Sequence, residues 1–203
     1  TELQIRSSCH ANPLTLLPGN VPIHERIDEW LAAGQPFIAC YADLDGFKPY
    51  NDFYGYARGD QVILRLAEVL ARHADPVRDF LGHIGGDDFV LLYASEDWHA
   101  RCEALIEDFA REQPLLYDEA ERRAGGIRAA DRSGRPCFHP LLSLSVGAVQ
   151  PDPARCHSHL DVAALLAGAK REAKRRPGNT LFVCRRRGPL PEGPKQDDPQ
   201  RAA

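Results

Sequence analysis

The residues best suited to chemistry begin with two aspartates that stand one residue apart. Asp43 and Asp45 flank Leu44 at the end of a short apolar run, residues 37–44, which predicts a buried strand. Side chains at positions i and i+2 of a strand point to the same face, so both carboxylates are expected on one side of the sheet and Leu44 on the other. This pair is the first candidate site.

A second pair of aspartates follows two glycines, in the order Gly85-Gly86-Asp87-Asp88. The runs on either side, residues 77–84 and 89–93, predict a hairpin that turns at the glycines. Glycines at a tight turn let a phosphate approach the backbone closely. If the two acidic segments lie on neighbouring strands, their carboxylates converge. Oxygen ligands at a strand edge suit Mg²⁺, which takes one or two protein carboxylates together with substrate phosphates.

Spacing alone leaves a simpler interpretation open. Aspartate and glycine are common turn residues, so either segment taken singly is better explained as a solvated acidic turn. Taken together, the two segments justify the hypothesis of a shared site without deciding it.

The elements that must position these residues alternate along the chain. Helical periodicity covers residues 21–33, 62–70, 96–112 and 162–176, and strands are expected at 37–44, 77–84, 89–93, 140–149 and 180–184. The charged, glycine-rich stretch at 117–137 predicts a second hairpin, with its tip at 131–134 and residues 140–149 as its return strand. This order fits a mixed α/β (α+β) sandwich, a central sheet flanked by helices, better than a doubly wound parallel sheet.

Composition narrows the class of protein. The chain has 203 residues, of which 43% are hydrophobic and 27% charged, as in an ordinary globular domain with room for an insertion or tail. A net charge of −4 gives no electrostatic case for nucleic-acid binding. No apolar run approaches the roughly 20 residues that span a bilayer, and no signal-peptide pattern is present, so we expect a cytoplasmic location without membrane contact. The absence of methionine indicates a piece of a longer protein.

Five stretches, in order, resemble motifs of the GGDEF family of diguanylate cyclases. Residues 43–60 resemble D-x-D-x-F-K-x-x-N-D-x-x-G-H-x-x-G-D, and residues 85–89 resemble the pentapeptide that names the family. Residues 14–20 resemble its opening motif L-T-G-L-P-N, residues 142–147 resemble a later strand, and Lys170 with Gly178-Asn179 resembles the closing K-x-x-G-R-N. Chance agreement in five ordered places is very improbable.

This resemblance implies a palm-like fold with a mostly antiparallel sheet, related to nucleotide cyclases and polymerases. It also implies a reaction that joins two GTP into cyclic di-GMP and releases two pyrophosphates. By position, Asp43 and Asp88 would bind Mg²⁺ (or Mn²⁺), with the Leu44 carbonyl as a further ligand. Asp87 and Asp88 would be the catalytic carboxylates, with Asp87 helping to deprotonate the attacking 3′-hydroxyl or holding a second metal. The residues expected to bind GTP are Phe47, Lys48, Asn51, Asp60, Gly85, Gly86, Lys170 and Lys174.

Two of these groups have roles with a clear physical basis. Asn51 and Asp60 would hydrogen-bond the guanine edge, because a buried acceptor for guanine N–H groups rejects a base that cannot donate there. Lys170 and Lys174 stand at positions i and i+4 of the last helix, so both can meet phosphate oxygens from one face. A solvated basic helix face is the alternative interpretation of the lysines.

The resemblance also implies partners and a domain layout. Each domain would hold one GTP, so a second copy is needed for turnover, and sensor or phosphodiesterase (EAL) domains are expected in the parent protein. We expect a lead-in with the opening motif at residues 1–20, a GGDEF domain at 12–184 with an inserted hairpin at 117–139, and a disordered tail at 185–203.

Three departures from the family pattern bear on activity. Asp88 replaces the usual glutamate of the signature and is one methylene shorter, and Tyr56 replaces a usual histidine near the nucleotide. The inhibitory R-x-x-D motif keeps Asp79 but has Pro76 in place of arginine, which predicts a degenerate inhibitory site. Arg78 is adjacent, but a shift of one residue along a strand points a side chain to the opposite face.

A fourth departure involves two positions that would lie close together. Asn12 and His83 replace a family aspartate and arginine, and we hypothesise that an ion pair has become a direct hydrogen bond between these two side chains.

Three functions remain to be distinguished. The first is an active diguanylate cyclase domain. The second is a catalytically weak or silent GGDEF domain that binds GTP and regulates an attached EAL or sensor domain. The third, an α/β interaction domain with acidic turns, explains the fewest motifs.

Overall fold

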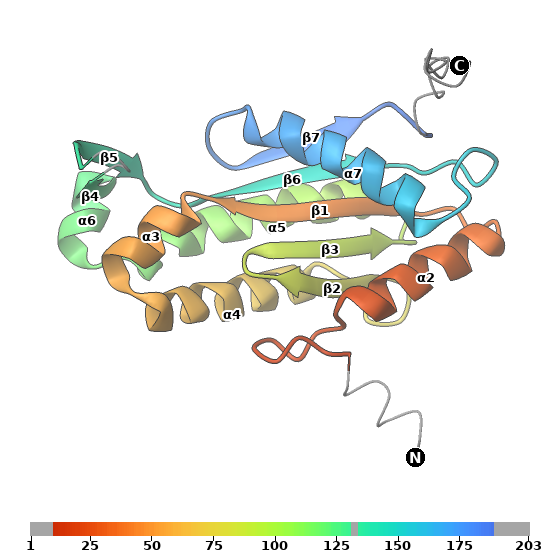
Figure 1. Ribbon diagram of the computed structural model, residues 1–203, viewed down its shortest axis with the longest axis horizontal. Coiled ribbons are helices and arrows are strands. Elements are labelled where there is room, and N and C mark those ends of the chain that lie inside the picture. The colour runs from red at the N-terminus through yellow and green to blue at the C-terminus, as the bar shows by residue number, and fades with distance from the viewer. Residues whose placement is uncertain (1–9, 131–133, 189–203) are drawn as a thin grey trace, which may run out of the picture.

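A five-stranded central sheet organises the chain in the computed structural model, which describes residues 10–130 and 134–188 (Figure 1). The strand order is β2-β3-β1-β6-β7. The strands are β1 (Ile38–Asp45), β2 (Phe80–Gly85), β3 (Asp88–Tyr93), β6 (Ser143–Val149) and β7 (Thr180–Cys184). The β6–β7 pair is parallel and the other three pairs are antiparallel. The mixed, mostly antiparallel sheet expected from the sequence is thus confirmed.

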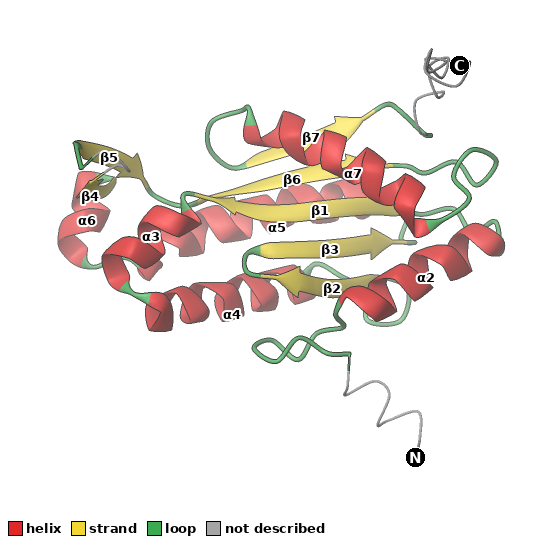
Figure 2. Cartoon of the chain, viewed as in Figure 1, coloured by secondary structure: helices red, strands yellow, loops and turns green. Residues whose placement is uncertain are grey.

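Helices cover both faces of this sheet (Figures 1 and 2). One face carries α2 (Asn20–Ala32) and α7 (His159–Lys174). The other carries α4 (Tyr56–Arg72) and α5 (Trp98–Glu112). The short helix α3 (Phe47–Tyr54) follows β1 directly at one end of the sheet. In the described parts of the chain, no helix has both the length and the apolar character needed to cross a membrane.

Burial on both faces of the sheet explains why β1 is almost entirely apolar. Cys40, Ala42 and Leu44 pack into the core beneath α4 and α5, while Ala39 packs into the core beneath α2 and α7. A central strand covered on both faces has to be nearly continuously apolar, as this one is. Asp43 interrupts the apolar run on the α7 face and is only 4% exposed. A carboxylate so deeply buried requires charged or hydrogen-bonding partners.

The expected hairpin of the insertion forms a small sheet of its own. The 3₁₀ helix η1 (Gln113–Leu116) and α6 (Glu119–Ala124) lead into β4 (Gly126–Ala130), which pairs antiparallel with β5 (Pro136–Pro140). The return strand predicted at 140–149 is therefore wrong, because residues 143–149 form β6 in the central sheet, between β1 and β7. Residues 131–133 of the predicted tip, 1–9 of the lead-in and 189–203 of the tail lie outside the described residues.

Candidate functional site

The two acidic segments meet at the place where β1 ends and β3 begins. These strands are paired, with Ala42 opposite Phe89, so Asp43 and Asp88 are neighbours across the ladder. Lys170 on α7 joins them, with its Nζ 2.5 Å from Asp43 Oδ2 and 2.7 Å from Asp88 Oδ1. The structure therefore brings together carboxylates that are 45 positions apart in sequence, as expected if the two acidic segments lie on neighbouring strands.

A second lysine on the same helix face completes the cluster. Lys174 pairs with Asp43, lies 3.5 Å from Asp45 Oδ1 and donates to the Leu44 carbonyl oxygen at 3.4 Å. Spacing of i and i+4 places both ammonium groups over the carboxylates. The lysines are therefore paired with carboxylates and do not form the solvated basic face of the alternative interpretation.

The carboxyl groups of Asp43, Asp87 and Asp88 have pKa values shifted in different directions. Burial, followed by the hydrogen bond with Asp88, raises the pKa of Asp43 to about 7 against the opposing effect of the lysines. Burial works to raise the pKa of Asp88 too, but hydrogen bonds from Asp43 and Lys170 outweigh it and lower that pKa. Burial and the nearby Asp88 charge raise the pKa of Asp87. Two carboxyl groups in contact cannot easily both be ionised, so this region holds a proton readily near neutral pH.

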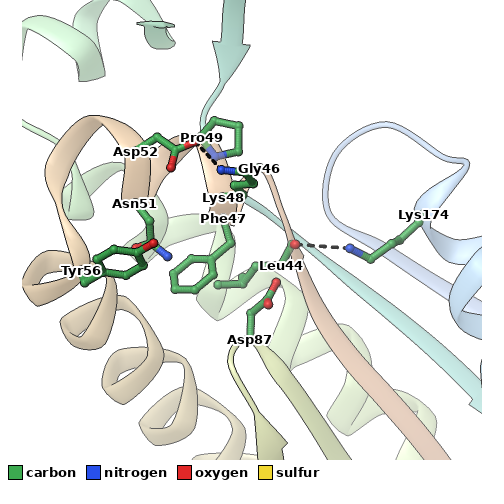
Figure 3. Close-up of a pocket in the computed structure, with 10 residues that line it drawn as sticks. All are labelled: Leu44, Gly46, Phe47, Lys48, Pro49, Asn51, Asp52, Tyr56, Asp87 and Lys174. Atoms are coloured by element: carbon green, nitrogen blue, oxygen red, sulfur yellow. Dashed lines mark hydrogen bonds and ion pairs between the residues drawn. The ribbon is translucent and has the colours of Figure 1, made fainter. Parts of the chain in front are cut away.

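A cavity of about 490 Å³ opens beside this cluster. Its lining comes from the end of β1, from α3, from the start of α4, from the β2–β3 turn and from α7 (Figure 3). The lining residues are Leu44, Gly46, Phe47, Lys48, Pro49, Asn51, Asp52, Tyr56, Asp87 and Lys174. Gly46 has a φ of 80° and lets the chain turn from β1 into α3 at once, so the helix begins beside the carboxylates.

Asn51 lines this cavity and carries a hydrogen-bond acceptor without a partner. Its Oδ1 is buried and makes no hydrogen bond within the described structure. The backbone of α4 comes close at Gly59, where an added Cβ would lie 1.8 Å from that oxygen. A buried acceptor without a partner costs free energy, and a ligand N–H group would recover it. The cavity thus contains one amide whose acceptor oxygen has no partner in the described structure.

The predicted site residues separate into those that line the cavity and those that do not. Leu44, Phe47, Lys48, Asn51, Asp87 and Lys174 line it, and Asp43, Asp88 and Lys170 form the adjoining charged cluster. Asp60 is exposed on α4 and does not line this cavity. Gly85 ends β2 and Gly86 begins the β2–β3 turn, with φ of 152° and 58°, and both lie outside the lining.

Tyr41 belongs to the cluster although the motifs did not identify it. The Lys170 ammonium lies 4.4 Å from the centre of its ring. Burial and the adjacent Asp88 charge raise the pKa of Tyr41 to about 12, so its phenol stays protonated. Because Tyr41 stands two residues before Asp43 on β1, strand alternation was the signal that could have placed it on this face.

The residues present fit the divalent metal that the resemblance implies. In the described ranges, no group of three or more histidine, cysteine, aspartate and glutamate side chains is arranged to hold a metal ion. Mg²⁺ does not need such a group, because it takes one or two carboxylates and completes its shell with phosphates and water. Asp43, Asp88 and the Leu44 carbonyl supply oxygens of this kind. The Lys174 ammonium already lies against Asp43 and Leu44, so this position suits a cation.

The hypothesis of a direct Asn12–His83 hydrogen bond is wrong. Asn12 Oδ1 accepts from the backbone N–H groups of Leu14 and Thr15 and so closes its own turn. His83 donates from Nε2 to the Gly86 carbonyl, at 2.9 Å, and its Nδ1 accepts from the Thr15 hydroxyl, at 2.8 Å. The opening motif still contacts β2, but Thr15 makes the contact because the turn places it, and not Asn12, beside the ring.

Asp79, which the resemblance assigned to a degenerate inhibitory motif, has a full set of internal partners. Its Oδ1 accepts from Ala94 N, Ser95 N and the Ser95 hydroxyl, and its Oδ2 accepts from Asp75 N. The carboxylate therefore links the loop before β2 to the loop after β3. An acceptor engaged in this way has a structural role.

Comparison with known sequences identifies the family. The family described as "Diguanylate cyclase, GGDEF domain" matches residues 10–124, more than half of the chain. The chain is 31% identical over 171 residues to "Uncharacterized protein Rv1354c" of Mycobacterium tuberculosis, which covers 81% of this chain and 27% of that protein. It is 30% identical over 180 residues to "Probable diguanylate cyclase DgcT" of Escherichia coli, which covers 88% of this chain and 36% of that protein. The chain thus spans only about a third or less of these relatives.

Solved structures show the same fold. The coiled coil and GGDEF domain of DgcB from Caulobacter crescentus, in complex with c-di-GMP, aligns with a TM-score of 0.65 at 22% identity and covers 90% of both chains. The GGDEF domain of PA1120 from Pseudomonas aeruginosa aligns with a TM-score of 0.63 at 22% identity, over 86% of this chain and 94% of that one. The chain belongs to the GGDEF family of diguanylate cyclase domains.

Proposed function

We propose that this domain binds GTP together with Mg²⁺ or Mn²⁺ and, facing a second copy of itself, condenses two GTP into cyclic di-GMP. The observation that carries the proposal is the layout of one cavity. Asn51, with its unpaired buried acceptor, lies on one side, and Leu44, Asp87 and Lys174 lie on the other, next to the Asp43–Asp88 pair (Figure 3). A guanine base needs the hydrogen-bond acceptor on one side, and a metal-bound triphosphate needs the charged groups on the other.

Base selection in this proposal rests on Asn51. Its Oδ1 accepts from guanine N–H groups, and adenine, which has no donor at the ring nitrogen, leaves that buried oxygen unpaired. Asp60, which is exposed and does not line the cavity, is proposed to add to recognition of the base. Phe47 and Lys48, which line the cavity, are proposed to lie near the triphosphate.

The phosphates are proposed to lie at the charged end. Lys170 and Lys174 exchange their carboxylate partners for phosphate oxygens, and Gly85 and Gly86 let the turn come close to the triphosphate. A divalent cation held by Asp43, Asp88 and the Leu44 carbonyl would neutralise charge on the triphosphate and on the departing pyrophosphate.

The reaction is in-line phosphoryl transfer. The 3′-hydroxyl oxygen of one GTP bonds to the α-phosphorus of the other, the bond from that phosphorus to the pyrophosphate breaks, and a second, symmetric step closes the ring. Asp87 lies in the cavity with a pKa raised by burial, which suits it to accept the hydroxyl proton. Because each domain holds one GTP, a lone domain binds substrate without turning it over.

A second function is favoured by the charged cluster itself. Asp88, one methylene shorter than the family's glutamate, is bound by Lys170, and Asp43 is bound by both lysines. A domain in which these ion pairs persist would bind GTP and regulate an attached sensor or EAL domain without catalysis.

One experiment separates these functions. The domain is fused to a dimerising coiled coil, incubated with GTP and Mg²⁺, and cyclic di-GMP is measured by chromatography. Product that disappears in Asp87→Asn and persists in Glu103→Gln, an exposed change on α5, supports the cyclase. GTP binding without product supports the regulatory function, and the absence of GTP binding contradicts both.

A further inference from the structure

The start of the insertion, together with the residue before it, contacts α3 through a segment we name the brace, residues 116–121. Tyr50 of α3 donates its hydroxyl hydrogen to the Leu116 carbonyl at 2.6 Å. Tyr54, one turn further along α3, donates to Glu121 at 3.3 Å and accepts from the backbone N–H of Asp118 at 3.2 Å. Both tyrosines of α3 that share this face are thereby hydrogen-bonded to the brace.

Arg58, near the start of α4, ties the same elements together. Its Nη1 donates to Asp118 at 2.9 Å and its Nη2 donates to the Leu116 carbonyl at 3.0 Å. Its guanidinium also lies 3.8 Å from the centre of the Tyr54 ring. A planar fork that stacks on one group and donates to two others fixes their relative positions better than a single surface ion pair would.

Tyr117 anchors the brace to the central sheet. Its ring packs edge-on against that of Tyr50, with centroids 5.2 Å apart, and its hydroxyl accepts from the backbone N–H of Leu142 at 2.8 Å. Leu142 immediately precedes β6, which pairs with β1. The brace therefore connects α3 to the same sheet that carries Asp43.

The helix that receives these contacts needs external support. α3 has only eight residues, and no side chain caps its first turn. A helix of two turns is marginal by itself, so tertiary contacts decide where it lies. Asn51 stands between Tyr50 and Tyr54 in this helix and must reach the base within a few tenths of an ångström to hydrogen-bond it.

We propose that the brace positions α3 for base recognition and that Arg58 and Tyr54 are positioning residues for GTP binding. This rests on the proposed function, because it takes GTP as the ligand of the cavity. It assigns a role to the insertion, which holds the base-recognising asparagine in place from outside the site.

The test is a double-mutant cycle on GTP affinity, measured with the full chain and Mg²⁺. Arg58→Met is expected to weaken GTP binding about tenfold, because Asn51 loses its fixed position. In an Asn51→Ala background the same change is expected to have less than a twofold effect. Arg123→Ala, which breaks an exposed ion pair with Glu119 inside α6, serves as the matched control and is expected to bind GTP like the wild type.

Two further measurements keep the test decisive. Thermal unfolding establishes that each variant is folded. If Arg58→Met is not, Tyr54→Phe, which keeps the ring and loses only the hydroxyl, replaces it with an expected weakening of about threefold. Arg58→Met with wild-type affinity, or an undiminished effect in the Asn51→Ala background, overturns the positioning role. A wild type that does not bind GTP overturns the proposed function as well, so the two failures are distinguishable.

Discussion

Replacing Asp79 by alanine is expected to destabilise the domain strongly. The carboxylate accepts four hydrogen bonds, at 3.0 Å from Ala94 N, 3.1 Å from Ser95 N, 2.9 Å from the Ser95 hydroxyl and 2.8 Å from Asp75 N. Ser95 is only 3% exposed, so water cannot readily replace the lost acceptor. The alanine variant leaves these donors beside an apolar methyl group.

The magnitude follows from the number of donors left without a partner. Each buried donor left unpaired costs about 1–3 kcal/mol, and bonds to one carboxylate are not additive, so we expect a loss of about 3 kcal/mol in the free energy of unfolding. With a urea dependence of about 2 kcal/mol per molar, the unfolding midpoint falls by about 1.5 M. Asp79→Asn keeps one acceptor oxygen and is expected to lose roughly half as much.

The assay is urea unfolding followed by far-ultraviolet circular dichroism. Asp75→Ala is the matched control, because Asp75 accepts from Val77 N and Arg78 N in an exposed turn, and its loss is expected to cost about 1 kcal/mol or less. If Asp79→Ala unfolds at the wild-type urea concentration, or if the two variants are equally destabilised, the structural role assigned to Asp79 is wrong.

Three further changes test other parts of the structure. Leu16 is 76% exposed with a φ of 59°, so Leu16→Gly is expected to relieve backbone strain and stabilise the domain by about 1 kcal/mol; a lower Tm would contradict this. Gly59→Ala places a Cβ 1.8 Å from Asn51 Oδ1 and is expected to weaken GTP binding at least about tenfold, measured by calorimetry, whereas unchanged affinity would remove Asn51 from base recognition. Gly147→Ala places a Cβ 2.6 Å from the Ala169 backbone and is expected to cost about 1–3 kcal/mol in urea unfolding, and a stability equal to that of the wild type would mean that α7 is not held at this contact.

Much of the fold could be predicted from the sequence because buried residues recur at a regular spacing along each helix and strand. The apolar run at residues 37–44 matches β1, and the paired glycines mark the turn between β2 and β3. Both signals are local, since strand burial and tight turns depend on residues that are close in sequence.

Strand ends and strand partners were less predictable. β2 begins at Phe80, three residues after the predicted Val77, because Asp75 accepts from Val77 N and Arg78 N and holds this stretch in a turn. Val77 is accordingly 90% exposed. Residues 143–149 pair with β1 instead of closing the insertion hairpin. Pairing between distant strands is set by the packed core, which local patterns do not encode.

The candidate site, like the fold, could be predicted only in part. The hypothesis that Asp43 and Asp88 lie close together is confirmed, because the end of β1 is paired with the beginning of β3. Motif spacing could not show that Thr15, rather than Asn12, bonds His83, since that choice depends on how one turn is closed. Nor could it show that the insertion contacts α3, because Tyr50 and Tyr54 stand at unspecified positions of the motif at residues 43–60.

The central claim is that Asp43 and Asp88 hold a divalent cation against a bound guanosine triphosphate. Titration of GTP at increasing Mg²⁺ tests it directly, with the wild type beside Asp43→Asn. The wild type is expected to bind GTP more tightly as Mg²⁺ rises, and the variant is expected to lose that dependence. An identical Mg²⁺ dependence in both proteins would contradict the claim.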